Sequence, residues 1–362
     1  MLMKRTAMET PSWNAGEREF AVRVECVSKQ YSAARPATGG GHRSGRRWAL
    51  QDVSFTVARG EMVGLLGPNG AGKTSLLKSI ATLLEVNSGR ITVEGIDVAA
   101  RPLEARRMMG LVTCDERSFY WRLSARANLK FFGALYRVPK QVLSKRINEL
   151  LDALDLADSA DRPYHSFSTG MRQKMAVARG LLTDPRLVLY DEPMRSLDPV
   201  SRERIRDWIR SSRQRDGGKT HIIATNQLDE AEQLCDRVLI LNGGKIVAQG
   251  SVREIRNRFG EEGQLVHRIT CTGFAPYFLL EPSPDRGLWD VTLEPGDAQT
   301  RVVRAATSSQ SEGLSLVLDW ILKAGGRVLK CETDQASFDE VFCRIIREGL
   351  DAGAPAAVEE RC

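Results

Sequence analysis

The chain has 362 residues, of which 42% are hydrophobic and 27% are charged, and its formal net charge is +6. This length and composition predict one large or two ordinary globular domains with sizeable cores. Basic residues are scattered rather than gathered on one stripe, so no nucleic-acid partner is expected. No run of about 18 apolar residues occurs, and we expect no membrane-spanning helix. The seven cysteines form no C-x-x-C pair, which argues against a zinc site.

The first predicted elements are strands. We expect residues 1–19 to be disordered, and residues 20–27 alternate apolar and polar side chains as a half-buried strand does. Residues 32–48 are rich in Gly and Arg, which predicts a loop. A second alternating strand is expected at 49–58, and the apolar run at 61–66 predicts a buried strand.

Helices and strands then alternate through the middle of the chain. A helix is expected at 75–84, and a helix-rich block at about 124–182. Further strands are expected at 187–191, 221–225, 237–241 and 245–248, and further helices at 199–213 and 228–234. This alternation predicts a parallel sheet with helices on both faces, beside which lie the early antiparallel strands and the helical insert.

The pattern changes after about Phe259, where prolines crowd a region of short strand-like runs. A helix, a strand and a helix are expected there, at 314–323, 327–331 and 337–346. We therefore expect a first domain at 20–258, a small α+β domain at 264–348 and a flexible tail at 349–362.

Residues 67–74 fit the phosphate-binding pattern G-x-x-x-x-G-K-[ST] at every fixed position. Glycines let consecutive backbone N–H groups point at phosphate oxygens, and the helix that follows favours an anion at its N-terminus. In this pattern Lys73 reaches the β- and γ-phosphates, and the Thr74 hydroxyl holds Mg²⁺. The predicted phosphate-binding residues are Gly67, Pro68, Asn69, Gly70, Ala71, Gly72, Lys73, Thr74 and Ser75.

Two carboxylates lie at the end of the apolar strand predicted at 187–191: Asp191 is its last residue, and Glu192 follows it. Carboxyl ends of strands face the ligand crevice of an α/β sheet, so Asp191 suits Mg²⁺ and Glu192 suits the polarisation of an attacking water. Ser168 is a natural N-cap for the helix after it, which makes a second candidate anion site. Alone, that cap is a weak signal.

Together these residues resemble the ATP-binding cassette (ABC) ATPase family over about residues 21–255. Residues 67–74 are similar to Walker A, and Asp191 with Glu192 to the end of Walker B. The signature-like residues are Ser168, Thr169, Gly170 and Met171, and the D-loop-like residues are Ser196, Leu197 and Asp198. Residues 336–342 are similar, over a short stretch, to the C-terminal extension of daunorubicin-type exporter ATPases.

The resemblance implies a P-loop NTPase (RecA-like) core with an antiparallel β subdomain and a helical subdomain. It also implies ATP and Mg²⁺ as ligands, bound between Walker A of one copy and the signature of the other in a homodimer. Tyr31 matches the aromatic residue that stacks on adenine. Hydrolysis would drive a separate integral-membrane permease, docked near residues 115–123, from the cytoplasmic face of the cell membrane. The direction, export, rests on the C-terminal resemblance.

Two positions depart from the family pattern. Asp115 stands where the family has a glutamine, and its carboxylate could offer an oxygen to Mg²⁺. Asn226 stands where the family has a histidine; it can hydrogen-bond the γ-phosphate but cannot carry a proton. Two interpretations stay open: slow hydrolysis with retained ATP binding, and ordinary hydrolysis with a subfamily variation at Asn226. The rival functions are an ABC-type ATP-binding switch that regulates an assembly and a metabolic kinase. The signature and D-loop disfavour the kinase.

Overall fold

The computed structural model describes most of the chain. The described residues are 20–31, 47–113, 119–195, 197–214, 218–259, 264–273, 280–295, 300–308, 312–335 and 337–351. The predicted disordered terminus, residues 32–46 of the predicted loop, most of the predicted tail, Asp115 and Ser196 lie outside them. Within the described residues a first compact unit ends at Gln249, and a second begins at Gly250. The boundary at 258 that the sequence suggested stays a prediction.

Two sheets build the first unit. A six-stranded sheet has the order β10-β9-β3-β8-β7-β6, and β3 pairs in parallel with β8 and β9, as β7 does with β6 and β8. An antiparallel sheet has the order β2-β1-β4-β5. The strands are β1 (Phe20–Tyr31), β2 (Arg47–Ala58), β3 (Met62–Leu66), β4 (Ser88–Val93), β5 (Ile96–Asp97), β6 (Met109–Thr113), β7 (Leu187–Asp191), β8 (Thr220–Ala224), β9 (Arg237–Asn242) and β10 (Lys245–Gly250). The predicted α/β core with an antiparallel β subdomain is confirmed.

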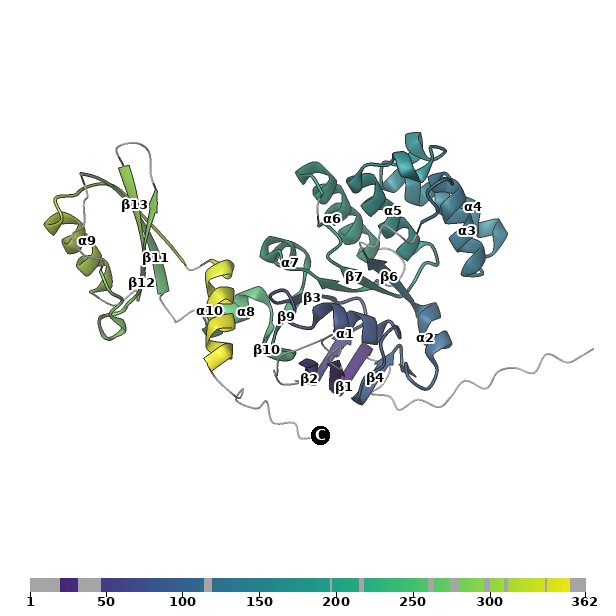
Figure 1. The fold of residues 1–362 in the computed structure, drawn as a ribbon, viewed down its shortest axis with the longest axis horizontal. Helices are drawn as coiled ribbons and strands as arrows, with labels where there is room; N and C mark the ends of the chain where they lie inside the picture. Colours follow the sequence, from purple (N-terminus) through teal and green to yellow (C-terminus); the bar gives the residue numbers. More distant parts are fainter. Residues whose placement is uncertain are drawn as a thin grey trace, which may run out of the picture. The chain divides into compact units, whose positions relative to one another are not determined.

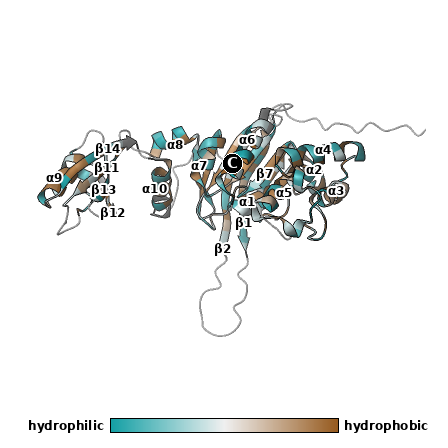
Figure 2. Cartoon of the chain, turned by 90° about the horizontal axis from the view of Figure 1, so that it is seen from above, coloured by the Kyte–Doolittle hydropathy of each residue, from teal (hydrophilic) through white to brown (hydrophobic). Residues whose placement is uncertain are grey.

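Helices cover both faces of the parallel sheet (Figure 1). They are α1 (Lys73–Ile80), α2 (Pro102–Met108), α3 (Ala125–Leu135), α4 (Lys140–Ala153), α5 (Thr169–Leu181), α6 (Pro199–Gln214) and α7 (Leu228–Leu234). The expected helical block contains α3, α4 and α5, which pack on one another beside β6. Helix α1 packs between the two sheets, so the loop before it lies where they meet. Teal and brown segments alternate along these helices in Figure 2, as expected of helices with one apolar face.

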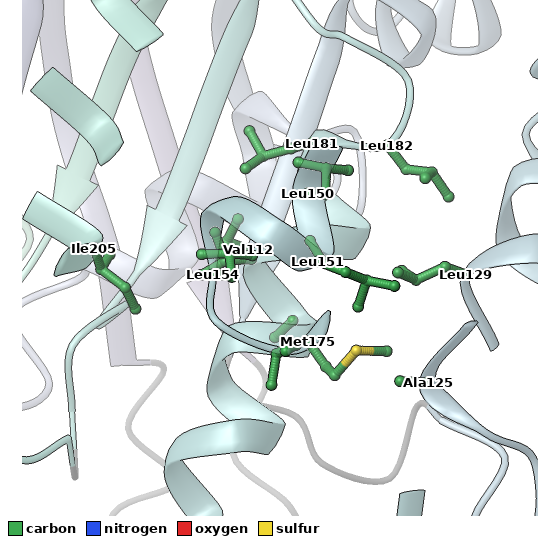
Figure 3. Close-up of a cluster of buried hydrophobic side chains, with 14 of the residues drawn as sticks. Val112, Ala125, Leu129, Leu150, Leu151, Leu154, Met175, Leu181, Leu182 and Ile205 are labelled. Carbon is green, nitrogen blue, oxygen red and sulfur yellow. The ribbon is translucent and has the colours of Figure 1, made fainter. Parts of the chain in front are cut away.

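The parallel sheet separates two hydrophobic cores, because side chains alternate between the faces of a strand. Val188 and Tyr190 of β7 belong to the cluster that α3, α4, α5 and α6 complete, part of which is drawn in Figure 3. Leu187 and Leu189 belong to the cluster that α1 and the antiparallel sheet complete. β7 is thus buried on both faces. Its C-terminal residue, Asp191, lies beside Thr74 at the start of α1.

Helix α1 ends at Ile80, four residues before the end predicted from the apolar spacing. Thr82 adopts a left-handed conformation with φ of +62°, which stops the helix. The carbonyl of Lys78 then accepts the backbone N–H groups of Leu83 and Leu84, at 2.8 and 3.1 Å. Apolar side chains therefore continue beyond the helix in a turn.

The second unit contains an antiparallel sheet of order β12-β13-β11-β14, with α9 packed against β13 and β14. Its elements are α8 (Val252–Phe259), β11 (Gln264–Thr272), β12 (Leu288–Pro295), β13 (Thr300–Ser308), α9 (Gly313–Lys323), β14 (Arg327–Gln335) and α10 (Phe338–Asp351). Ile269, Val303 and Trp320 are part of its buried cluster. The predicted small α+β fold is confirmed. None of the described helices combines the length and apolar character that a membrane span requires.

Several elements were missed in the sequence, namely α2, α8, β4, β5 and β6. For α8 a signal was present, because Ser251 and Glu254 form a capping box. The N–H of Ser251 donates to the Glu254 carboxylate at 2.7 Å, and the N–H of Glu254 donates to the Ser251 hydroxyl at 3.1 Å. Ser337 and Glu340 make the same pair at the start of α10. Helix α8 packs against α10 in the second unit.

Candidate active site

A cavity of about 280 Å³ lies at the N-terminus of α1. Its described lining combines the end of β1, the start of β2, the predicted phosphate loop and the residue after β7. The lining residues are Tyr31, Trp48, Ala49, Asn69, Gly70, Ala71, Gly72, Lys73, Thr74, Ser75 and Glu192. The structure thus brings together the predicted aromatic residue, most of the phosphate loop and the predicted water-polarising carboxylate.

The phosphate loop has a backbone that depends on glycine. Gly72 has φ of +111°, and a Cβ there would lie 2.4 Å from the carbonyl oxygen of Ala49. Gly72 is also the N-cap of α1, and no side chain caps this helix end. The first N–H groups of α1 are therefore available to an anion, as the motif requires.

Lys73 is buried, and its ammonium is held by the loop itself. Its Nζ donates to the carbonyl oxygens of Gly67, at 2.5 Å, and of Pro68, at 3.2 Å. Burial lowers the pKa of Lys73, whereas the nearby charges of Glu192 and Asp191 raise it. Because both acceptors are neutral carbonyls, the oxygens of a phosphate would compete well for this cation.

Thr74 and Asp191 form the pair expected of a metal site. The Thr74 hydroxyl donates to Oδ1 of Asp191 at 3.0 Å, across 117 residues of sequence. Burial raises the pKa of Asp191, and the bond from Thr74 partly offsets this rise. A hydroxyl and a carboxylate are hard oxygen donors of the kind that Mg²⁺ prefers, so the pair fits that ion.

Glu192 has an unusual backbone for its residue type. Its φ is +52°, and its N–H donates to the carbonyl of Ala224 at 2.8 Å. This left-handed conformation costs energy in a non-glycine residue, and such strain is concentrated at functional sites. Oε2 of Glu192 accepts from Nη1 of Arg195 at 3.0 Å. Sequence reasoning did not single out Arg195.

The signature-like segment opens α5, as predicted. The Ser168 hydroxyl accepts the N–H of Met171 at 3.3 Å and caps the helix. Ser168 and Thr169 are exposed, and a Cβ on Gly170 would lie 3.5 Å from the side chain of Leu197. Asp198 of the D-loop accepts the N–H of Ser201 at 2.9 Å and starts α6. No signature residue is among the described residues that line the cavity of the same chain.

Asn226 follows β8 and is exposed. It is not among the described residues that line the cavity. Its neighbour Thr225 is fixed, because its N–H donates to Leu65 at 3.1 Å and its hydroxyl donates to Glu230 at 2.9 Å. The role of Asn226 towards the γ-phosphate stays a prediction, as does that of Asp115.

Trp48 and Ala49 are cavity residues that the sequence did not indicate. Residue 48 was assigned to the predicted loop, whereas β2 begins one residue earlier, at Arg47. Trp48 lies opposite Gln30 in the β1–β2 ladder, next to the pair of Tyr31 and Arg47. Trp48 reaches the cavity with this register, and a register across a 15-residue connection cannot be predicted from either strand alone.

A fold and a site of this kind define an ATP-binding P-loop protein. Residues 50–195 match the ABC transporter family. The chain is 33% identical over 307 residues to a daunorubicin resistance ATP-binding protein of Streptomyces coeruleorubidus, covering 85% of this chain and 94% of the relative. It is 38% identical over 243 residues to the doxorubicin resistance ATP-binding protein of Mycobacterium tuberculosis, covering 67% and 69%.

A solved ATP-binding subunit of an ABC transporter is similar in structure, with a TM-score of 0.57 and 29% identity. The match covers 66% of this chain and 93% of that subunit. The chain belongs to the ABC transporter family, among the ATP-binding subunits of the daunorubicin-type exporter group. It binds ATP and is an ATPase, as the sequence predicted, and the non-hydrolysing switch is not favoured.

Proposed function

We propose that the chain works as a homodimer that binds two Mg-ATP and drives a separate integral-membrane permease from the inner face of the cell membrane. The observation that carries the proposal is the meeting of Lys73, Thr74 and Glu192 in one cavity. A buried ammonium, a hydroxyl and a carboxylate are the groups that phosphoryl transfer to water uses. The cavity therefore supports hydrolysis as well as binding.

Each group has a distinct task in this proposal. Lys73 and the first N–H groups of α1 hold the β- and γ-phosphates. Glu192 accepts a hydrogen bond from the attacking water and orients it. Thr74 and Asp191 would hold Mg²⁺, which spreads the negative charge of the phosphate oxygens. Asp115 is a further candidate ligand.

The position of the signature supports a dimer. Ser168, at the start of α5, is exposed, and its segment does not contribute to the described lining of its own cavity. A second copy arranged head to tail would bring this segment, including Thr169 and Gly170, to the γ-phosphate. Each ATP would then lie between the phosphate loop of one copy and the signature of its partner.

A larger cavity of about 1040 Å³ offers a surface for the permease. It runs from the helical block to Asp191, and its lining includes the exposed side chains of Leu83, Leu103 and Leu135. The same lining includes Arg106 and Arg137, so exposed leucine side chains lie beside cations, a mixture that suits a protein partner. We place the docked permease segment here.

The predicted docking loop divides into two parts. Phe119 is 4% exposed and stacks on Tyr164, with ring centroids 4.8 Å apart, so it packs within the chain. Tyr120 and Trp121 are 51% and 47% exposed. Within the described part of this loop, 119–123, the exposed side chains of Tyr120 and Trp121 are therefore available to a permease interface, whereas Phe119 is not.

The names of the relatives support a direction of transport. They describe resistance to daunorubicin and doxorubicin, which favours export over uptake. The cargo itself would be selected by the permease rather than by this chain.

Hydrolysis and dimerisation of the purified chain test the proposal. We expect Lys73→Ala to lose both ATP binding and turnover, and Glu192→Gln to lose turnover while it traps an ATP-bound dimer. Light scattering with and without Mg-ATP would measure the dimer. Binding and dimerisation without any turnover that depends on Glu192 would contradict a hydrolytic motor.

A further inference from the structure

Two aromatic side chains line the nucleotide cavity, and only one of them has a role so far. Tyr31 at the end of β1 is 45% exposed, and Trp48 at the start of β2 is 44% exposed. Exposure of an indole to this extent leaves a large apolar surface in water. In a cavity, such a surface is available to a ligand.

Tyr31 and Trp48 both belong to the end of the β1–β2 ladder. Trp48 is paired with Gln30, one step along the ladder from Tyr31. The Tyr31 hydroxyl lies 3.2 Å from the Ser75 hydroxyl, which ties this side of the cavity to α1. The ammonium of Lys29 lies 5.7 Å from the centroid of the Tyr31 ring. Side chains of neighbouring pairs point to opposite faces of a ladder, so Tyr31 and Trp48 reach the cavity from opposite faces, at the end of the ladder.

A bound nucleoside triphosphate has its two ends in different chemical surroundings here. Its phosphates belong with Lys73 and the N-terminus of α1, for the reasons given above. Its base is then directed to the aromatic part of the lining, which Tyr31 and Trp48 form. A flat heteroaromatic base gains most from contact with aromatic faces.

We propose that Trp48 is a second base-contacting residue, so that the purine of ATP is held by two aromatic side chains rather than by Tyr31 alone. This inference rests on the proposed function, because it takes the phosphate loop as the site of the triphosphate. It has a consequence for specificity. A purine overlaps two rings better than a pyrimidine does, and Trp48 therefore favours ATP over CTP.

Calorimetric titration of the full chain with Mg-ATP, Mg-CTP and inorganic tripolyphosphate tests the role of Trp48. We expect Trp48→Ala to raise the Kd for Mg-ATP about tenfold, because the variant loses one base–aromatic stack, and a tenfold change corresponds to about 1.4 kcal/mol. The ratio of the CTP and ATP Kd values should fall in the same variant. The affinity for tripolyphosphate should not change, because it has no base. Trp48→Phe should retain most of the ATP affinity.

Phe131→Ala is the matched control, because Phe131 is 40% exposed on α3 and does not line the described cavity. Its ATP affinity should equal that of the wild type. Equal ATP affinity in Trp48→Ala and wild type would overturn the inference and leave the proposed function intact. A parallel loss of tripolyphosphate affinity would also overturn it, since Trp48 would then support the loop. Failure of the wild type to bind Mg-ATP would instead overturn the proposed function.

Discussion

Arg195 lies three residues after Glu192, and its Nη1 is 3.0 Å from Oε2 of that carboxylate. The side chain of Arg195 is 70% exposed and that of Glu192 is 19% exposed. The ion pair therefore joins an exposed cation to the group proposed to orient the attacking water. An exposed pair of this kind is weak and can be broken by a ligand or a partner.

The pair predicts that Arg195 restrains hydrolysis. In Arg195→Ala one hydrogen bond that competes with the attacking water for the carboxylate is removed, and we expect kcat to rise about 1.4- to fivefold, in keeping with an exposed ion pair worth roughly 0.2–1 kcal/mol. Arg195→Lys, which keeps the charge, should behave as the wild type does. Steady-state ATPase assays measure both. A lower kcat in Arg195→Ala would mean that this cation assists the reaction.

The left-handed backbone at Gly72 predicts a large effect of a single methyl group. Gly72→Ala places a Cβ 2.4 Å from the carbonyl of Ala49, at φ of +111°. We expect the overlap with this carbonyl, added to the backbone strain, to lower the free energy of unfolding by about 1–3 kcal/mol and to weaken ATP binding. Gly243→Ala is the control, because its φ of +55° is also left-handed but no atom lies within 4 Å of the new Cβ. Similar urea midpoints for the two variants would disprove the steric argument.

The asparagine at position 226 leads us to expect that a mutation there can raise the kcat of ATP hydrolysis. A histidine at this position could hydrogen-bond the γ-phosphate and also carry a proton, so Asn226→His should turn over faster than the wild type. Asn226→Ala, which lacks both properties, should be slower by up to about 10²-fold if the asparagine positions the phosphate. Equal kcat in all three proteins would show that this position does not limit the rate.

His267 predicts a dependence of stability on pH in the second unit. Its ring lies between Thr307 and Thr333, with Nε2 2.7 Å and Nδ1 2.9 Å from their hydroxyl oxygens. Burial lowers the pKa of His267 in the folded chain. The unfolded chain then takes up the proton first, so the free energy of unfolding falls as pH drops below about 6.5.

Urea unfolding at about pH 7.5 and about pH 5.5 checks this prediction. The wild type should lose stability between the two values, followed through a probe in the second unit. His267→Gln should lose less, because its amide does not titrate. An identical loss in both proteins would assign the pH dependence to other groups.

Local chemistry explains what the sequence could predict at the site. The phosphate loop is specified by glycines whose backbone no other residue type adopts easily, and Asp191 and Glu192 end an apolar strand. Each of these signals is contained within a few consecutive residues. Each was therefore readable without the fold.

The missed features depend on pairing over long distances or on rare backbone states. Trp48 reaches the cavity through the pairing of β2 with β1. The bond from Arg195 to Glu192 forms beside the left-handed backbone of Glu192, which the sequence does not predict. Helix α1 stops because Thr82 takes a conformation that β-branched residues seldom adopt. Helix α8 is a different case, since its capping box was present in the sequence and was overlooked.

The alternation of β7 between two cores limits how this strand can change during evolution. Leu187 and Leu189 fill one core, whereas Val188 and Tyr190 fill the other. Inserting or deleting one residue would exchange the two sets and also turn Asp191 to the opposite side of the sheet. Apolar replacements of similar volume are tolerable, but a change in length is not. Homologues should therefore vary in the composition of this strand while keeping its spacing to the carboxylates.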